Sequence, residues 1–162
     1  MDLIVLSHDE IQKRIDGHAM WLINPTTGER LVFQSVNVLG FCFRNRDLRD
    51  AIFINSYLRD CDFRHADLRG ADFTGANLSR ANMNGTDLRY ANMTDANMTD
   101  AEVENADLRG AILVDTNMIR VGVQNSDFRG ANMKVAGAPY AFDGNADLRD
   151  TYLSHLATDW CT

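Results

Sequence analysis

The sequence predicts an all-β solenoid, a chain wound into stacked coils whose sides are short extended segments. Two observations predict it. A large apolar residue recurs at every fifth position, without interruption, from Val38 to Met133. An Asp-Leu/Phe-Arg triplet recurs at every twentieth position from Asp47 to Arg149. An amphipathic helix needs a period of about 3.6 residues and a strand a period of about two, so we expect instead a chain that turns a corner every five residues.

The residue types within each pentapeptide fit such a side. A small residue, usually alanine, stands two positions before each large apolar one, and Asp or Asn usually stands directly before it. Because the side chains of an extended segment alternate, the large and small residues point inward together, while the Asp or Asn and the two following residues point to water. Burial of each large residue contributes about 1.5–3 kcal/mol to stability. The pattern therefore predicts a core large enough to stabilise a chain that has few helices.

The repeat of twenty laid on the repeat of five makes every fourth side alike, which supports four pentapeptides per coil. About six coils stacked at about 4.8 Å would form a rod roughly 29 Å long. One wall should carry a column of arginines beside a column of aspartates. This double column is either a solvated salt-bridge zipper worth little per pair or a surface that binds a carboxylate-rich partner. The arginines are Arg49, Arg69, Arg89, Arg109, Arg129 and Arg149, and the aspartates stand two positions before each.

The run ADLRGADFTGANLSRANMNGTDLRYANMTDANMTD, at 66–100, resembles the pentapeptide-repeat proteins, and the resemblance covers about residues 36–155. It implies a right-handed quadrilateral parallel β-helix. We therefore expect three segments: 1–35 as an N-terminal helix and cap, 36–155 as the β-helix, and 156–162 as a C-terminal tail.

Both ends of a solenoid expose strand edges that need covering. Ser7 and Glu10 form a capping-box pattern, which predicts a helix from about residue 8 to residue 22 that acts as a lid on the first coil, with His18 and Trp21 packed there. The other end either caps the last coil or joins two rods. Gyrase-directed relatives dimerise there, so the resemblance implies that a homodimer is one option and a capped monomer the other. The candidate contacts are Tyr152, Leu153, Leu156 and Trp160.

The middle of the rod is acidic, and its carboxylates fall on several columns. They serve either as ordinary solubilising charge or as a partner-binding surface. Similarity to fluoroquinolone-resistance members of the family implies an acidic rod that imitates DNA and acts on DNA gyrase. The arginine wall has no obvious counterpart in a DNA mimic, and no long loop interrupts the coils. The candidate acidic residues are Asp95, Asp100, Glu102, Glu104 and Asp115.

Composition narrows the function class further. A net charge of −7 disfavours direct binding to nucleic acid or an anionic membrane. No apolar run is long enough to span a bilayer, and the four apolar residues near the start are too few for the core of a signal peptide. We therefore expect a cytoplasmic protein.

Three cysteines without CxxC spacing predict free thiols. No catalytic residue, metal site or cofactor is expected, because the four histidines are scattered and no nucleophile motif or phosphate loop occurs.

Three function classes remain. The first is a non-enzymatic protein-binding module, most concretely a DNA mimic whose partner is a type II topoisomerase such as DNA gyrase. The second is a structural scaffold or spacer, for example in a phage or secretion assembly, that uses the walls with aligned columns of side chains for protein contacts. The third, an enzyme, has the least support in the sequence. A contiguous negative surface would favour the first class, and a zippered, near-neutral surface the second.

Overall fold

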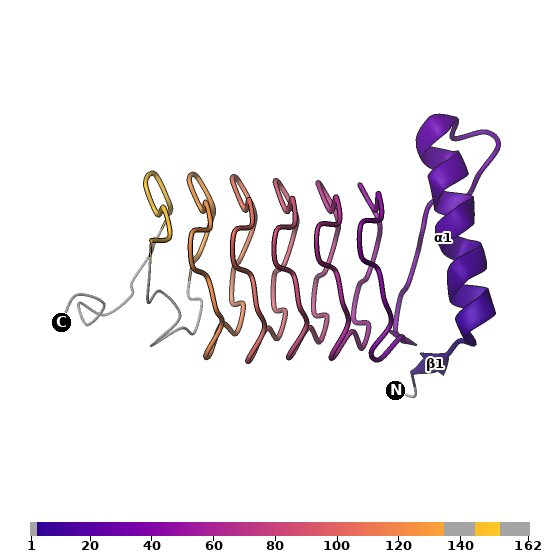
Figure 1. Cartoon of the computed structure of the whole chain (residues 1–162), viewed down its shortest axis with the longest axis horizontal. Coiled ribbons are helices and arrows are strands. Elements are labelled where there is room, and N and C mark those ends of the chain that lie inside the picture. Colours follow the sequence, from indigo (N-terminus) through magenta and orange to yellow (C-terminus); the bar gives the residue numbers. More distant parts are fainter. Residues whose placement is uncertain (1–2, 135–144, 153–162) are drawn as a thin grey trace.

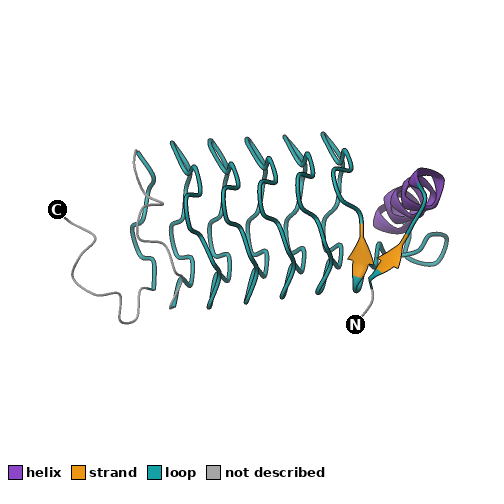
Figure 2. Cartoon of the chain, turned by 90° about the horizontal axis from the view of Figure 1, so that it is seen from below, coloured by secondary structure: helices purple, strands orange, loops and turns teal. Residues whose placement is uncertain are grey.

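The computed structural model describes residues 3–134 and 145–152. Successive coils lie side by side along one axis, and helix α1 (His8–Ile23) lies against the N-terminal end of the stack (Figure 1). Within the described ranges, the regular strands are β1 (Ile4–Val5) and β2 (Val36–Asn37), which pair in parallel. The view from below shows the same stack of repeated coils (Figure 2).

Residues twenty positions apart are paired throughout the stack. Parallel bridges run from Val32 with Ile52 to Asn132 with Tyr152. One repeating unit of the ladder is the bond from the Phe53 amide to the Asp72 carbonyl, 2.7 Å, and the bond from the Asp72 amide to the Ala51 carbonyl, 2.9 Å. This spacing confirms the predicted coil of four pentapeptides.

The interior holds one large and one small side chain per side, as predicted. Ala51 and Phe53, which belong to one side, are both fully buried, and the same alternation recurs along most of the stack. In the N-terminal half, the Phe43 ring stacks on Phe63 with centroids 4.7 Å apart. The methionines at central positions fill the core of the later coils, as expected from their phase: Met83, Met93, Met98, Met118 and Met133.

The last residue of each pentapeptide forms the corner, and its backbone takes the left-handed conformation. Asp50 has a φ of 59° and Gly70 a φ of 67°. Glycine, asparagine and aspartate adopt this conformation at lower cost than other residues, and they hold most corners. The exceptions among the described corners are Ser35, His65, Arg80, Tyr90 and Arg120. An aspartate at a corner therefore tolerates the left-handed backbone and also places a charge on the surface.

The lid forms as the sequence predicts. The side chain of Ser7 accepts a bond from the Glu10 amide, and the Glu10 carboxylate accepts one from the Ser7 amide, 2.8 Å long. Ile11, Ile15 and His18 form the buried face of α1. The parallel ladder begins at Val32, inside the segment assigned to the cap. The division at 35/36 and 155/156 stays a prediction.

At the other end the ladder returns in phase after residue 144. Asp147 pairs with Asp127, and Tyr152 pairs with Asn132 while remaining 62% exposed. Leu153, Leu156 and Trp160 lie outside the described residues. The dimer contact and the homodimer itself stay predictions. Within 3–134 and 145–152, no helix has the length and apolar character needed to cross a membrane.

Candidate functional site

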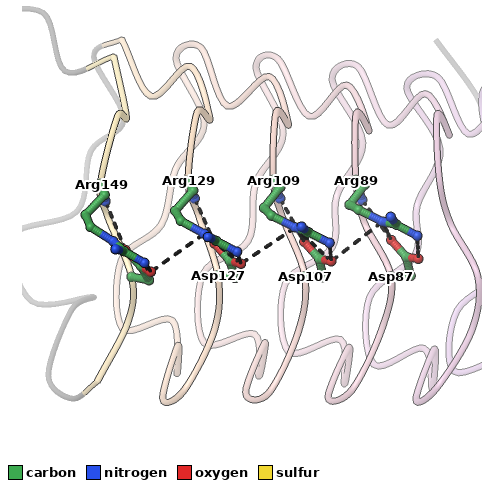
Figure 3. Close-up of polar contacts among 8 residues, drawn as sticks. Asp87, Arg89, Asp107, Arg109, Asp127, Arg129 and Arg149 are labelled. Atoms are coloured by element: carbon green, nitrogen blue, oxygen red, sulfur yellow. Dashed lines mark hydrogen bonds and ion pairs between the residues drawn. The ribbon is translucent and has the colours of Figure 1, made fainter.

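The Asp-Leu/Phe-Arg triplets build one wall of paired charges (Figure 3). Arg89 donates from Nε to Oδ1 of Asp87, 2.8 Å, and from Nη2 to Oδ2, 2.6 Å. Its Nε also lies 3.6 Å from Oδ2 of Asp107 in the next coil. The same pairing joins each ladder aspartate to the arginine of its own coil. We call this wall the Asp–Arg ladder.

The local backbone holds each aspartate in place for its arginine. Asp127 Oδ1 also accepts a bond from the backbone amide of Arg129, 3.1 Å long. The triplet is thus a small turn whose Asp and Arg share the outward face. The hydrogen bonds from Arg129 hold the pKa of Asp127 below its ordinary value, and those from Arg149 lower the pKa of Asp147 to about 2.

The ladder has a direction, because each arginine reaches toward the aspartate of the following coil. At its C-terminal end the Arg149 side chain is 73% exposed, against 32% for Arg89. In the part of the chain that is described, the Nη1 groups of the ladder arginines make no hydrogen bond. The zipper interpretation therefore accounts for the observed contacts, and binding of a partner by the arginines stays a prediction.

The five candidate acidic residues fall on several columns, as expected from the sequence. Asp100 is paired with Arg120, 2.5 Å from Nε to Oδ1, in a corner column where Asp60 and Arg80 also pair. Asp95 and Asp115 lie twenty residues apart at the preceding corner, with φ of 57° and 55°. A whole side, 97–99, separates that corner from the Asp100 corner.

Glu102 and Glu104 lie on the next wall, beyond the Asp100 corner. The Glu102 carboxylate accepts bonds from the side-chain amides of Asn82, 2.6 Å, and Asn84, 3.1 Å. The Asn84 side chain also accepts a bond from the Glu104 amide, 2.7 Å. Among the described residues, four of the five candidates make no ion pair: Asp95, Glu102, Glu104 and Asp115.

Family comparison agrees with this geometry. The model of the family described as pentapeptide repeats matches in overlapping segments at 43–75, 66–102, 76–113 and 96–134, more than half of the chain. The chain belongs to the pentapeptide-repeat family. No curated protein is significantly similar to this pentapeptide-repeat protein in sequence.

Two solved structures with TM-scores above 0.5 share the fold, and a third is similar in sequence. A pentapeptide repeat protein from Nostoc PCC 7120 is 30% identical over 64% of this chain and 84% of its own, with a TM-score of 0.56. QnrB1, a plasmid-mediated fluoroquinolone resistance protein, matches in a trypsin-treated form at 22% identity over 74% of this chain, with a TM-score of 0.52. A thylakoid-lumen pentapeptide repeat protein from Arabidopsis thaliana is 32% identical over 62% of this chain, with a TM-score of 0.48. The chain spans 59% of the QnrB1 chain and 66% of the Arabidopsis one.

Two features of this pentapeptide-repeat protein were missed in the sequence. Asp62 and Arg64 form a pair like those of the ladder on another wall, with 2.6 Å between Nη2 and Oδ2. The triplet Asp62-Phe63-Arg64 carries that signal but lies outside the period of twenty. The pair of Asp100 with Arg120 could have been found from their spacing of one coil.

Metal binding and thiol chemistry depend on the His, Cys, Asp and Glu side chains of the described part of the chain. No group of three or more His, Cys, Asp or Glu that could hold a metal occurs there. Cys42 and Cys61 are free thiols, as expected, while Cys161 lies outside the described residues. Burial raises the pKa of Cys61 to about 12, so its thiol is unreactive near neutral pH.

Proposed function

We propose that this protein is a non-enzymatic, protein-binding rod that acts as a rigid scaffold. The observation that carries the proposal is the Asp–Arg ladder, in which each aspartate already has an arginine partner in its own coil. Such a wall is close to neutral, and it presents the Nη1 groups at a regular spacing to a partner's carbonyl or carboxylate oxygens. From the family we also infer a right-handed winding and about six coils.

A second candidate function is imitation of DNA toward a type II topoisomerase such as DNA gyrase. The net charge of −7 and the four carboxylates without ion pairs support it. The likeness to QnrB1 concerns the fold alone at 22% identity. Two findings count against it: Asp100 is neutralised by Arg120, and the remaining carboxylates are divided between a corner and a different wall. This distribution favours the scaffold.

The rigidity of the rod is tested by a distance between two spin labels. Arg44 and Gln124 are exposed and belong to one column, four coils apart, so their backbones should lie about 19 Å apart. We would replace both by labelled cysteines in a Cys42→Ser, Cys161→Ser background and measure the distance distribution. A single narrow distribution supports a rigid spacer. A broad distribution would show that the stack bends, and would contradict the scaffold.

The DNA-mimic candidate is tested by inhibition of gyrase supercoiling over a concentration series of purified protein. The test variant reverses the unpaired carboxylates: Asp95→Lys, Glu102→Lys, Glu104→Lys and Asp115→Lys. A matched control, Asp60→Asn with Asp100→Asn, removes two paired carboxylates. The scaffold proposal predicts no inhibition by the wild type at tens of micromolar. Inhibition that the test variant loses and the control keeps would replace the scaffold by the DNA mimic.

A further inference from the structure

His18 lies in the contact between the lid and the first coil, where it is completely buried. Its Nδ1 accepts a hydrogen bond from the backbone amide of Leu31, 3.0 Å long. Its ring stacks on Trp21, with centroids 5.5 Å apart and an interplanar angle of 13°. Because Nδ1 accepts a hydrogen bond, it carries no proton, and the imidazole is neutral with its proton on Nε2.

The other ring nitrogen is less well satisfied. His18 Nε2 is buried and has no hydrogen-bond partner of ordinary geometry among the described residues. A second proton on the ring would put two donors face to face, since the Leu31 amide already points at Nδ1. It would also bury a positive charge that forms no ion pair with any described carboxylate, which is costly inside a protein.

We propose that His18 is an acid-sensitive latch, which holds α1 on the end of the solenoid when neutral and releases it when protonated. The latch requires no particular partner, so it is independent of the proposed function. What the lid covers is the open end of the stack. Leu31 and Phe33 are buried there, and Arg14 donates from α1 to the carbonyl of Val32, 3.4 Å away. Release of α1 uncovers this core and its strand edge.

Burial sets the direction of the effect on the pKa of His18, and the charged groups around the ring modify it. Burial is the largest influence and lowers its pKa. The backbone of Arg49 and the carboxylates of Asp47 and Asp50 on the first coil oppose this, while the Arg30 guanidinium on the returning segment adds to it. The net direction is a lowered pKa with the lid closed.

The sign of the pH dependence follows from this difference. In the open lid His18 regains its ordinary pKa of about 6.5. The closed state is therefore fully populated at higher pH. Closing weakens as pH falls below about 6.5, by about tenfold for each pH unit, until the pKa of the closed form is reached.

The test compares hydrogen exchange of the α1 amides with that of the coil amides across pH. Between about pH 7.5 and pH 5.5, protection of 8–23 relative to the coils should fall about tenfold in the wild type. His18→Asn does not titrate, and its side-chain oxygen can accept the bond from Leu31, so its relative protection should stay constant. His8→Asn, at the exposed start of α1, should keep the wild-type fall.

A proton NMR titration of the His18 ring in the wild type needs no variant and keeps the test decisive if His18→Asn folds poorly. The latch predicts that the ring resonance moves only as α1 loses protection. A ring that titrates near its ordinary pKa while α1 stays protected would overturn the proposal. Equal pH dependence of α1 protection in the wild type and a folded His18→Asn variant would overturn it as well.

Discussion

Arg89 donates two hydrogen bonds to Asp87 in its own coil and lies 3.6 Å from a carboxylate oxygen of Asp107 in the next. Asp107 in turn contacts Arg109, 2.7 Å away. Inner members of the ladder therefore each have two partners of opposite charge. The wall links neighbouring coils while it neutralises itself, which is why we regard it first as part of the scaffold.

Position along the ladder should decide the effect of losing an arginine. Arg89→Gln removes a pair within its coil and an approach to the next coil, whereas Arg149→Gln removes only the pair with Asp147. We expect a larger decrease in the urea midpoint for Arg89→Gln, measured by circular dichroism at low salt. High salt should shrink the difference, because both pairs are at least partly exposed to solvent.

Arg44→Gln is the matched control, since Arg44 makes no ion pair among the described residues. It should leave the midpoint unchanged. Equal losses for Arg44→Gln and Arg89→Gln would mean that the ladder pairing does not contribute to stability.

Acid should weaken the ladder through its aspartates. The bonds from Arg129 lower the pKa of Asp127 in the folded state, so its contribution is present above the unfolded value of about 3.9 and is lost as pH falls through the folded value. We expect Asp127→Asn to lower the urea midpoint at neutral pH and to leave a smaller further loss between about pH 4 and pH 2 than the wild type shows. Parallel acid curves for the two proteins would argue against this role.

Two glycines at equivalent corners should respond differently to alanine. Gly110 and Gly130 both have a φ of 68°. An added Cβ at Gly110 would meet Cε1 of Tyr90 at 2.7 Å, whereas at Gly130 nothing lies within 4 Å. Gly130→Ala should cost about 1–2 kcal/mol for the left-handed backbone alone. Gly110→Ala should cost more, because the Tyr90 ring must move.

Tyr90→Asn provides the control for this comparison, since asparagine suits the corner and removes the ring. In that background Gly110→Ala should cost no more than Gly130→Ala in urea unfolding. If Gly110→Ala and Gly130→Ala lower the stability equally with Tyr90 in place, the Tyr90 ring does not restrict the residue at position 110.

The aromatic stack should dominate the core of the N-terminal half. Phe63 is fully buried and stacks on Phe43 at 4.7 Å. Phe63→Ala should lower the free energy of unfolding by about 3–5 kcal/mol, because it leaves a cavity in a narrow interior. Met98→Leu conserves volume and should cost less than about 1.5 kcal/mol in the same urea experiment. Similar losses for both would show a core that repacks freely.

The repeating parts of the molecule were predictable, because one geometric rule serves every side. Alternation of side chains placed Leu48 and Ala51 in the core, and the period of twenty aligned Asp47 with Asp67. The corners themselves were predicted, but the left-handed backbone of the corner residues was not. Asp95 and Asp100 were interpreted as surface charge, although their left-handed backbone independently favours aspartate.

Contacts made by tertiary packing were also beyond the sequence pattern. The capping box predicted the lid, and the placement of His18 against the first coil was expected. Its hydrogen bond with the Leu31 amide depends on how the lid docks, which no local pattern specifies. The contact of the Tyr90 ring with Gly110 of the next coil also depends on the orientation of the Tyr90 side chain, which the repeat does not specify.

The central claim is that walls built on a period of twenty, and not merely a core built on a period of five, specify this rod. Two deletions separate these alternatives. Removing 81–100 takes out one whole coil and keeps every wall aligned, while removing 81–90 keeps the inward pattern but turns the following walls by half a coil. In the second variant Arg69 would lie beside Asn97 where Asp87 now lies.

Urea unfolding of the two deletion variants, followed by circular dichroism, tests the claim most directly. We predict cooperative unfolding with a midpoint near that of the wild type when 81–100 is removed. Removal of 81–90 should give a clearly lower midpoint, although fewer residues are lost. If the shorter deletion is as stable as the longer one, the period of five alone specifies the fold, and the paired walls do not.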